Sequence, residues 1–328
     1  MELIYCDLDL NLNMYNVPKI YRKKLVDRFK ECSFIYESEI NNANFSNVKI
    51  YWGNRLPNDF LRIFPNLKWI HFGSVGIDRF QKINDPEKEK IIVTNSQNSV
   101  TKGMYAHTLF QIFYLLRQGY LINRMRLLNS LSRENFDINY KNILNVNDLK
   151  VLIVGYGNIG SKLGSSLKQM GAQVNGIALT ERESKDGINI YKIDKLLDLV
   201  RTHNFVIGLL PFHTKLKGIF NKQVFDQMPI NSYFINNGRA SHVNEIDLCL
   251  ALKKNLSGAA IDVFDMNKIQ KKINILEIEN LLVTPHIGAI DPSYWPSQIE
   301  LFEYNLECYL DNNLSKMKNI CNINIEND

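Results

Sequence analysis

The fold of this chain is decided by the stretch Val151-Leu152-Ile153-Val154-Gly155-Tyr156-Gly157-Asn158-Ile159-Gly160. Four β-forming residues predict a buried strand, and three glycines follow at G-x-G-x-x-G spacing before a helical pattern begins. In such a turn the first glycine permits the tight bend, the second admits a pyrophosphate and the third lets the helix pack on the strand. We therefore expect a dinucleotide on this turn and on the free N–H groups of the helix N-terminus. The expected contacts are Gly155, Tyr156, Gly157, Asn158, Ile159 and Gly160.

The glycine turn alone leaves two alternatives open. One is a purely structural strand–turn–helix, and the other is a methyltransferase of the Rossmann type with a related glycine loop. Features elsewhere in the chain have to distinguish these alternatives.

Composition favours a two-domain protein that does not act on nucleic acid. The chain has 328 residues, of which 45% are hydrophobic, enough for two ordinary domains. The net charge of +5 is small, and the basic residues are interspersed with acids, which argues against a nucleic-acid partner. The five cysteines are widely spaced without a C-x-x-C, so we expect neither a disulfide framework nor a metal site.

We expect a cytoplasmic protein that does not enter the membrane. Glu2, Asp7 and Asp9 interrupt the apolar start of the chain, which therefore does not resemble a signal peptide. The apolar segment 110–128 contains three arginines, so we do not expect it to span a bilayer.

The order of predicted elements indicates two α/β regions. In the first region, strands are expected at 3–6, 48–52, 67–72 and 91–93, with helices at 17–30 and 101–129. In the second, strands are expected at 151–154, 173–178, 205–210, 232–236, 258–261 and 281–284, with helices at about 159–170, 193–201, 221–227 and 244–253. A last helix is expected from about 297 to 311. Alternating strands and helices are typical of parallel sheets, and six strands with crossover helices match a complete doubly wound sheet.

Three further motifs place polar groups at the carboxyl ends of predicted strands. They are Asn236-Asn237-Gly238-Arg239-Ala240, the strand 258–264 with its Asp262-Val263-Phe264, and Thr284-Pro285-His286-Ile287-Gly288. Open α/β sheets bind their ligands at this edge. The sequence therefore predicts one site to which all three motifs contribute.

These motifs, in this order and together with the glycine turn, resemble the D-isomer-specific 2-hydroxyacid dehydrogenase family. The segment Ser74-Val75-Gly76-Ile77-Asp78 is similar to the family's substrate loop. The resemblance implies a doubly wound parallel-sheet (Rossmann) cofactor domain, residues 100–291, inserted in a smaller flavodoxin-like α/β substrate domain, residues 1–99 and 292–328. The active site would lie in the cleft between them. It also implies a homodimer with the 101–129 helix at the subunit interface, whose alternative is an ordinary interdomain core helix.

The residue types suit the reduction of a 2-oxo acid. Arg239 offers a forked, permanently charged donor for the carboxylate and the carbonyl, and His286 has the side-chain type that most often serves as a proton donor in catalysis. Backbone N–H groups at Ser74, Val75 and Gly76 would hold the substrate carboxylate. Asn54 ends a strand that should face the cleft, although a surface turn explains it equally well.

The resemblance also assigns cofactor contacts outside the glycine turn. Asp262 stands where the family's aspartate binds the nicotinamide carboxamide. The remaining contacts expected around the nicotinamide are Leu210, Pro211, Asn237, Gly238 and Gly288.

The chain departs from the family pattern at the partner of the histidine. The family usually has a glutamate there, and Asn267 occupies that position, with Asp265 two residues earlier. A neutral amide can still bond to the imidazole, so we interpret Asn267 as the third catalytic residue. Smaller departures are Ala106, His213 and Ala240. Together they suggest a divergent substrate or, in the extreme, a lost reaction.

The cofactor is expected to be NADP or NAD, with NADP favoured. Ala178 stands where NAD enzymes carry an aspartate for the ribose hydroxyls. Without that charge, Thr180 and Arg182 can bind a 2′-phosphate, although Leu179 replaces the arginine usual in NADP enzymes. The alternative for Arg182 is a solvated loop charge.

We therefore predict an NAD(P)-dependent oxidoreductase that acts on a small 2-oxo or 2-hydroxy carboxylate. The alternative from another class is a cofactor-binding sensor or corepressor-like protein that kept the fold and lost efficient turnover. Retention of Arg239 and His286 favours the enzyme, whereas loss of the glutamate at 267 favours the sensor. Methyl transfer has no use for this arginine and histidine.

Overall fold

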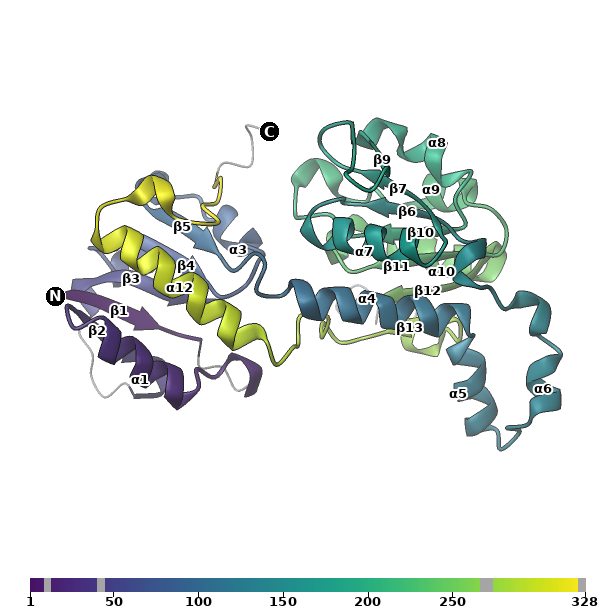
Figure 1. The fold of residues 1–328 in the computed structure, drawn as a ribbon, viewed down its shortest axis with the longest axis horizontal. Coiled ribbons are helices and arrows are strands. Elements are labelled where there is room, and N and C mark those ends of the chain that lie inside the picture. The colour runs from purple at the N-terminus through teal and green to yellow at the C-terminus, as the bar shows by residue number, and fades with distance from the viewer. Residues whose placement is uncertain (9–12, 40–44, 266–273, 324–328) are drawn as a thin grey trace. The chain divides into compact units, whose positions relative to one another are not determined.

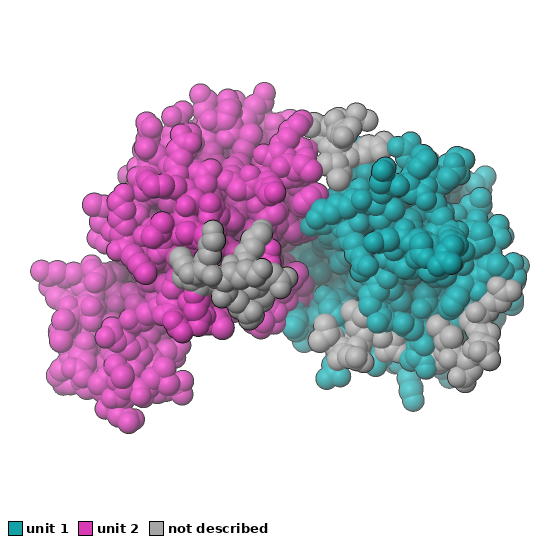
Figure 2. All heavy atoms as spheres, turned by 180° about the vertical axis from the view of Figure 1, so that it is seen from behind, with its two compact units in different colours: residues 1–102, 290–328 teal, residues 103–289 magenta. Residues whose placement is uncertain are grey.

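The computed structural model describes residues 1–8, 13–39, 45–265 and 274–323 and divides into two compact units (Figures 1 and 2). Unit 1 contains Met1–Lys102 and Ile290–Asp328, and unit 2 contains Gly103–Ala289. The chain leaves unit 1 once and returns to it, so unit 2 is an insertion in unit 1. The sequence-based boundaries lie at 99/100 and 291/292, against 102/103 and 289/290 in the structure.

Unit 2 is built on a sheet of eight strands with the order β13-β12-β11-β10-β6-β7-β9-β8. The strands are β6 (Lys150–Val154), β7 (Gln173–Ile177), β8 (Arg182–Glu183), β9 (Asn189–Tyr191), β10 (Phe205–Gly208), β11 (Ser232–Asn236), β12 (Leu256–Ile261) and β13 (Leu281–Val283). All pairs are parallel except β8 with β9. The strand order reverses between β6 and β10, which is where doubly wound sheets bind dinucleotides.

Alternate residues along each strand of unit 2 serve two separate hydrophobic cores, as the two-residue repeat of a strand requires. Val151 and Ile153 of β6 pack with α4 (Thr101–Leu116) and α7 (Asn158–Gln169). Leu152 and Val154 pack on the other face with the three helices that follow β9, β10 and β11. These are α8 (Leu196–Val200), α9 (Lys222–Gln227) and α10 (Glu245–Lys254). The sheet is therefore covered on both faces, which confirms the predicted doubly wound fold.

The prediction of one continuous helix over 101–129 is wrong. Helix α4 ends at Leu116, Gln118 adopts a left-handed φ of 52°, and a new helix α5 (Gly119–Leu127) begins. The ring of Tyr114 packs against Gly119, where a Cβ would lie 2.3 Å from a ring carbon. A glycine is required at this break, which a pattern of apolar residues alone does not reveal. A short helix α6 (Arg133–Asp137) follows, with the Ser132 hydroxyl accepting from the Asn135 N–H at 3.1 Å.

Unit 1 contains a five-stranded parallel sheet with the order β2-β1-β3-β4-β5. Its strands are β1 (Glu2–Cys6), β2 (Cys32–Tyr36), β3 (Val48–Gly53), β4 (Trp69–Phe72) and β5 (Ile92–Asn95). This order is that of flavodoxin-like folds, as predicted. Strand β2 was not predicted, nor were β8 and β9, and all three lie at or next to a sheet edge, where the burial pattern is weak.

Helices cover both faces of the unit 1 sheet. They are α1 (Lys19–Arg28), α2 (Phe60–Ile63), α3 (Asp78–Gln81) and α12 (Tyr294–Leu310). Phe60 and Phe80, from α2 and α3, join a core with Ile70 of β4. Phe302 of α12 stacks on Trp52 of β3 with ring centroids 4.0 Å apart. The C-terminal segment thus returns to complete the N-terminal domain.

The structure contains no helix, within its described residues, that is long and apolar enough to cross a membrane. Across the same ranges, no three His, Cys, Asp or Glu side chains gather into a group that could hold a metal ion.

Candidate active site

The turn between β6 and α7 requires glycine at its first and last positions for reasons internal to the protein. Gly155 has a φ of 109°, and a Cβ there would lie 2.5 Å from the carbonyl carbon of Leu209 at the end of β10. A Cβ on Gly160 would lie 2.5 Å from the Gly155 carbonyl oxygen. These two glycines therefore bring β6, β10 and α7 together at the point where the strand order reverses.

The middle glycine has no such internal reason. A Cβ on Gly157 would meet nothing within 4 Å, and its φ of −90° is open to any residue. The turn is exposed there, and Asn158 and Ile159 begin α7, whose first N–H groups have no acceptor within the helix. The vacant space over these donors fits a bound diphosphate.

Tyr156 contributes to the turn by its backbone and to the core by its ring. The N–H groups of Gly155 and Tyr156 both donate to the Ile177 carbonyl, at 2.9 and 2.8 Å. The ring is buried against Gly176, where a Cβ would approach it to 2.5 Å. The side chain of Tyr156 thus anchors the turn to β7. Only the backbone of this residue is placed to contact a cofactor.

The end of β7 brings Thr180 and Arg182 beside the glycine turn. Arg182 donates from Nη1 to both the carbonyl and the hydroxyl of Thr180 at 3.1 Å, and from Nη2 to the Tyr156 carbonyl at 3.3 Å. Ala178 carries no charge, and its N–H donates to the Tyr191 carbonyl of β9 at 2.9 Å. An exposed cation and a hydroxyl therefore lie a few residues after the uncharged Ala178, with the cation bonded to the glycine turn.

Asn236 shapes the turn that carries Arg239. Its Nδ2 donates to the Arg239 carbonyl at 3.0 Å, and its Oδ1 accepts from the Gly238 N–H at 3.3 Å. A Cβ on Gly238 would lie 2.8 Å from the Leu210 carbonyl oxygen, so this turn abuts the segment after β10 that also contains Pro211. Arg239 is half-buried, and its Nη1 donates to the Gly238 carbonyl at 2.9 Å.

Asn237 belongs to this turn, and one polar atom of its side chain has no hydrogen-bond partner among the described residues. The side chain is buried, and its Nδ2 donates to Thr108 and Gln111 of α4, at 2.9 and 2.7 Å. Its Oδ1 is also buried and has no hydrogen-bond partner in the described parts of the chain. Since buried polar atoms are normally satisfied, this oxygen is a candidate acceptor for a ligand.

His286 stands exposed after β13 in a strained backbone conformation. Its φ is 56°, in the left-handed region that a residue with a Cβ seldom occupies. Its N–H donates to the carbonyls of Asp262 and Thr284, at 3.0 Å each. Strain of this kind persists only where the surroundings impose it, and it is concentrated at functional sites.

The surroundings that impose it are centred on Asp262. The Asp262 side chain is 1% exposed and accepts from the Thr284 hydroxyl at 2.6 Å and from the Ile287 and Gly288 N–H groups at 2.9 Å each. A Cβ on Gly288 would lie 2.9 Å from Asp262 Oδ2. Both carboxylate oxygens are therefore engaged in holding the His286 loop, an internal role that the sequence reading did not foresee beside the predicted carboxamide contact.

Asn267, the predicted third catalytic residue, lies outside the described residues. Asp265 is described, and its N–H donates to a carboxylate oxygen of Glu245 at 2.9 Å. The pairing of His286 with residue 267 therefore stays a prediction.

In unit 1, the loop 73–76 directs its carbonyls inward. The Gly73 carbonyl accepts from Tyr294 at 2.8 Å, the Val75 carbonyl from Asn95 at 2.8 Å and the Gly76 carbonyl from the Ser74 hydroxyl at 2.9 Å. By contrast, the N–H groups of Ser74, Val75 and Gly76 donate to no residue that the structure describes. Successive N–H groups of this kind form an anion-binding surface.

A second turn of unit 1 is organised by Asp7, which sequence reasoning missed. Asp7 is buried, and its carboxylate accepts from the Asn54 N–H at 2.7 Å, the Arg55 N–H at 3.0 Å and the Tyr51 hydroxyl. Burial raises the pKa of Asp7, and these hydrogen bonds oppose the rise. The Oδ1 atom of Asn54 is buried without a partner among the described residues.

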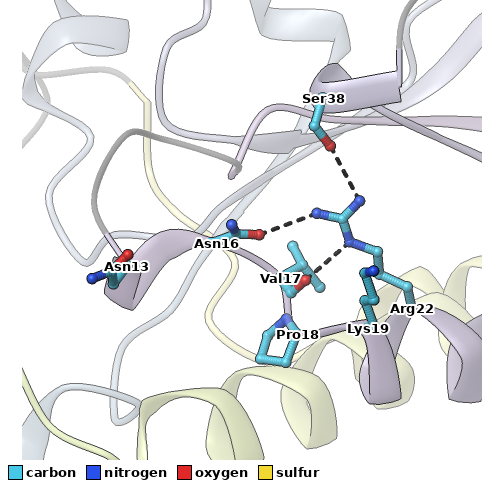
Figure 3. Close-up of a pocket in the computed structure, with 7 residues that line it drawn as sticks. All are labelled: Asn13, Asn16, Val17, Pro18, Lys19, Arg22 and Ser38. Atoms are coloured by element: carbon cyan, nitrogen blue, oxygen red, sulfur yellow. Dashed lines mark hydrogen bonds between the residues drawn. The ribbon is translucent and has the colours of Figure 1, made fainter.

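A hollow of about 520 Å³ in unit 1 lies apart from all of these motifs (Figure 3). Arg22 dominates it, and its guanidinium donates to the Val17 carbonyl at 2.9 Å and to Ser38 and Asn16 at 3.2 Å each. Because these contacts lie within unit 1 and occupy the guanidinium, we do not assign this hollow to the site.

Further residues with a structural role in these turns were not predicted from the sequence, although each has a sequence feature that could have identified it. Asp7 is an acid directly after a buried strand, and Asn236 is the first residue of a motif already recognised. His107 was not among the predicted site residues, and its side chain is only 10% exposed and contacts Thr284 and Gln111. His107 and Gln111 are four residues apart on an apolar helix, so they lie on one face of it.

Comparison with known proteins supports the family resemblance that the sequence motifs indicated. Residues 116–288, just over half of the chain, match the model of the D-isomer specific 2-hydroxyacid dehydrogenase NAD binding domain. A glyoxylate/hydroxypyruvate reductase A from Photorhabdus laumondii is 31% identical over 144 residues, 44% of this chain and 46% of the relative. The reductase HPR2 of Arabidopsis thaliana is 25% identical over 246 residues, 75% of this chain and 76% of the relative. Several curated relatives are thus matched over about half of their length.

Solved structures share the fold over nearly the whole chain. An NADPH-dependent glyoxylate/hydroxypyruvate reductase from Sinorhizobium meliloti, solved with NADP and sulfate, has a TM-score of 0.80 at 21% identity, covering 98% of this chain and 99% of that one. A D-lactate dehydrogenase from Aquifex aeolicus, solved with NAD and lactic acid, has a TM-score of 0.76 at 20% identity, covering 97% and 98%. With the fold, the ordered motifs and the family match in agreement, this chain belongs to the D-isomer specific 2-hydroxyacid dehydrogenase family.

Proposed function

We propose that this protein is an NAD(P)H-dependent reductase of small 2-oxo acids of the glyoxylate and hydroxypyruvate class. The observation that carries the proposal is the exposed His286, held at a φ of 56° by a buried carboxylate. It follows a strand of the same sheet whose β6–α7 turn leaves room for a diphosphate and whose β11 leads to Arg239. The names of the relatives supply the substrate class.

The residues of this chain act on the substrate as follows. The nicotinamide, when bound, supplies the hydride that reduces C2 of the 2-oxo acid. Arg239 donates hydrogen bonds to the substrate carboxylate and to the C2 carbonyl oxygen, where negative charge develops. His286 donates a proton to that oxygen, so the ketone becomes a hydroxyl and the imidazole becomes neutral. The N–H groups of Ser74, Val75 and Gly76 are further donors for the carboxylate, and Asn54 lines the substrate.

For the cofactor, we propose NADP over NAD. Arg182 and Thr180 are together a donor pair for a 2′-phosphate, and an uncharged Ala178 does not repel it. Leu210, Pro211, Asn237 and Gly238 would contact the nicotinamide half, and the buried Asn237 Oδ1 is a ready acceptor for it. For Asn267 we propose a neutral hydrogen-bond partner of His286.

The direct test is a panel of 2-oxo acids with NADPH and with NADH, following the absorbance of the reduced cofactor. We expect turnover with glyoxylate or hydroxypyruvate and a higher kcat/KM with NADPH. Tight NADPH binding without turnover of any 2-oxo acid would contradict the proposal and favour a sensor instead.

We also propose that unit 2 forms a homodimer through the segment 110–138. Figure 1 shows α5 and α6 projecting from the end of α4, beyond the sheet. Large apolar side chains on this segment are exposed, which soluble monomers rarely tolerate as a group. They are Phe110 (50%), Phe113 (40%), Ile122 (42%), Leu127 (73%), Leu128 (64%), Leu131 (63%) and Ile138 (80%).

A second copy of the same chain is the occupant to test by light scattering after gel filtration. We expect a dimer for the native protein, and a monomer for Leu127→Glu combined with Leu131→Glu. The matched control is Leu179→Glu, since Leu179 is 91% exposed but lies outside this segment. A native protein that is monomeric at micromolar concentration would rule the dimer out.

A further inference from the structure

Close to the two turns that present Arg239 and His286 lies a continuous set of polar side chains, which come from α4 and from the residues directly after β11, β12 and β13. All of its members belong to unit 2. Their hydrogen bonds run from Thr108 to Asn237, from Asn237 to Gln111 and from Gln111 to His107. At the other end, His107 contacts Thr284, which donates to Asp262. Asn237 stands two residues before Arg239 in the sequence, and Asp262 accepts hydrogen bonds from Ile287 and Gly288, directly after His286.

The direction of each hydrogen bond in this set of side chains follows from the Thr108 hydroxyl, at one end of it. The Thr108 hydroxyl uses its single proton on the Met104 carbonyl at 2.7 Å, so its oxygen can only accept from Asn237. The Asn237 amide therefore turns its nitrogen towards α4, and Gln111 must accept with its oxygen at 2.7 Å. This fixes both amide orientations without reference to the histidine.

His107 receives the last donor of the chain. With its oxygen committed, Gln111 presents its Nε2 to His107 Nε2 at 3.0 Å. That ring nitrogen must therefore accept, and the proton of the neutral ring must lie on Nδ1. On the far side, the Thr284 hydroxyl donates to Asp262 Oδ1 at 2.6 Å, which is shorter than its 3.1 Å contact with His107 Nε2. In this tautomer the proton of the Thr284 hydroxyl is already used on Asp262, so the approach of His107 Nε2 to Thr284 is a close contact and not a hydrogen bond. The directed hydrogen bonds therefore end at His107, and packing continues the connection to Thr284.

We propose that His107 and Gln111 are positioning residues, which connect the Arg239 turn to the His286 loop through these hydrogen bonds and the contact of His107 with Thr284. They touch neither substrate nor reacting atoms. Asn237 precedes Gly238 and Arg239, and Thr284 precedes Pro285 and His286, so a displacement in the middle of the chain moves both turns. This inference rests on the proposed function, because that function gives the spacing of Arg239 and His286 its importance.

Burial supports the neutral state that the chain requires. Desolvation lowers the pKa of His107, and the Asp262 carboxylate, 3.5 Å from Nε2, opposes that shift. Protonation would set an N–H of His107 against an N–H of Gln111 at 3.0 Å. The hydrogen bond from Gln111 to His107 therefore holds only while His107 Nε2 carries no proton.

The test compares two substitutions of His107. His107→Phe keeps a planar ring but removes the acceptor, whereas His107→Gln can again offer an acceptor to Gln111. We expect His107→Phe to lower kcat by about tenfold to a hundredfold, the scale of a misplacement of about 1 Å, with NADPH affinity changed less than about twofold. His107→Gln should recover most of kcat. Gln111→Leu should act like His107→Phe, and the double variant should be no worse than either, as expected for a single chain.

The matched control is Tyr105→Phe, which removes a hydrogen bond from the same helix to Ser166 at 2.9 Å, outside the chain. It should leave kcat unchanged. If His107→Phe does not fold, Gln111→Leu carries the same comparison. An active native enzyme whose kcat is unaffected by His107→Phe and by Gln111→Leu would overturn the proposal.

A second measurement does not depend on turnover. In ¹⁵N-labelled protein, we expect His107 as the neutral Nδ1–H tautomer, and a shift of the Gly238 and Arg239 amide resonances in His107→Phe. An Nε2–H tautomer, or unmoved amides at 238 and 239, would overturn the directed chain. A native protein that shows these signals but reduces no 2-oxo acid would contradict the proposed function and leave the chain of hydrogen bonds supported.

Discussion

At the scale of single residues, the side chain of Arg239 can be substituted, whereas the backbone turn that presents it depends on Asn236. Arg239 is presented by a turn whose geometry Asn236 sets through two hydrogen bonds, neither of which involves the guanidinium. Replacing the arginine side chain should therefore leave the turn intact. The substitution should therefore lower the rate of the reaction without disturbing the fold of the turn.

For Arg239→Ala we expect kcat/KM for a 2-oxo acid to fall by at least about a hundredfold, on the order of 3 kcal/mol of transition-state stabilisation. NADPH affinity, followed by fluorescence titration, should change little. Arg201→Ala is the control, since Arg201 is an exposed arginine of the same unit whose Nε donates to Gln227 at 2.8 Å. Near-native turnover of Arg239→Ala would make this arginine structural and contradict its assignment.

The sequence indicated the residues that we propose to contact a ligand better than those that hold them in place. Gly157, Arg239 and His286 belong to short motifs at the ends of strands, and local spacing suffices to recognise them. Asp262 was recognised too, but as a ligand contact, because nothing local shows that both its oxygens are satisfied by residues 284–288. The left-handed φ of His286 is likewise imposed by tertiary contacts.

At the scale of elements, the β6–α7 turn separates glycines needed for folding from one needed for binding. We expect Gly160→Ala to lower the free energy of unfolding by about 1–3 kcal/mol, because its Cβ would lie 2.5 Å from a backbone oxygen. Gly157→Val should unfold like the native protein, since no atom lies within 4 Å of that Cβ, yet its Kd for NADPH should rise at least about tenfold. Thermal melts with cofactor titration check both. Native affinity in Gly157→Val would place the diphosphate elsewhere.

The proposed preference for NADP over NAD rests on the residues at the end of β7. Ala178→Asp should shift the preference from NADPH towards NADH by roughly 1–2 kcal/mol, the scale of one charged hydrogen bond. Ala178→Asn has the same shape without the charge and should shift it less. Titration of each variant with both cofactors decides the matter. A native protein that already prefers NADH would refute the role given to Ala178.

The central strands and the edge strands β5 and β13 were predictable, whereas the edge strands β2 and β8 and the helix break at Gln118 were not. Strands β6, β10 and β11 are buried on both faces and form continuous apolar runs, which identify them without a partner. Strand β8 has two charged residues, and only its pairing with β9 makes it a strand. The helix break at Gln118 depends on the Tyr114 ring packing over Gly119, which is a tertiary contact.

At the scale of the whole molecule, burial of neutral histidine makes stability depend on pH. His71 in unit 1 is fully buried beside Thr94, and burial lowers its pKa from 6.5 to about 3. Between pH 6.5 and about 3, the imidazole of His71 is protonated in the unfolded chain and neutral in the native state. The contribution of His71 to stability is therefore complete above pH 6.5 and is lost as the pH falls towards 3.

We expect the free energy of unfolding of unit 1 to fall below pH 6.5 with a His71 contribution of roughly 1.4 kcal/mol per pH unit. All three tryptophans, Trp52, Trp69 and Trp295, lie in unit 1, so urea unfolding followed by tryptophan fluorescence reports on it. His71→Asn should lose this part of the slope, and His213→Asn should keep it. Equal slopes for the native protein and His71→Asn would show that His71 does not cause the dependence.

The position of Arg182 has a consequence for protein engineering and for colloidal behaviour. It belongs to β8, the outermost strand of the unit 2 sheet, and it is exposed. Short, charged edge strands keep a sheet from pairing with the sheets of other molecules. A redesign that exchanges Arg182 for a β-branched apolar residue, in order to abolish 2′-phosphate recognition, would at the same time remove a gatekeeper against intermolecular β-pairing. With Arg182 in its proposed role, one side chain serves both cofactor selectivity and resistance to aggregation, and a glutamate or a serine is the safer replacement.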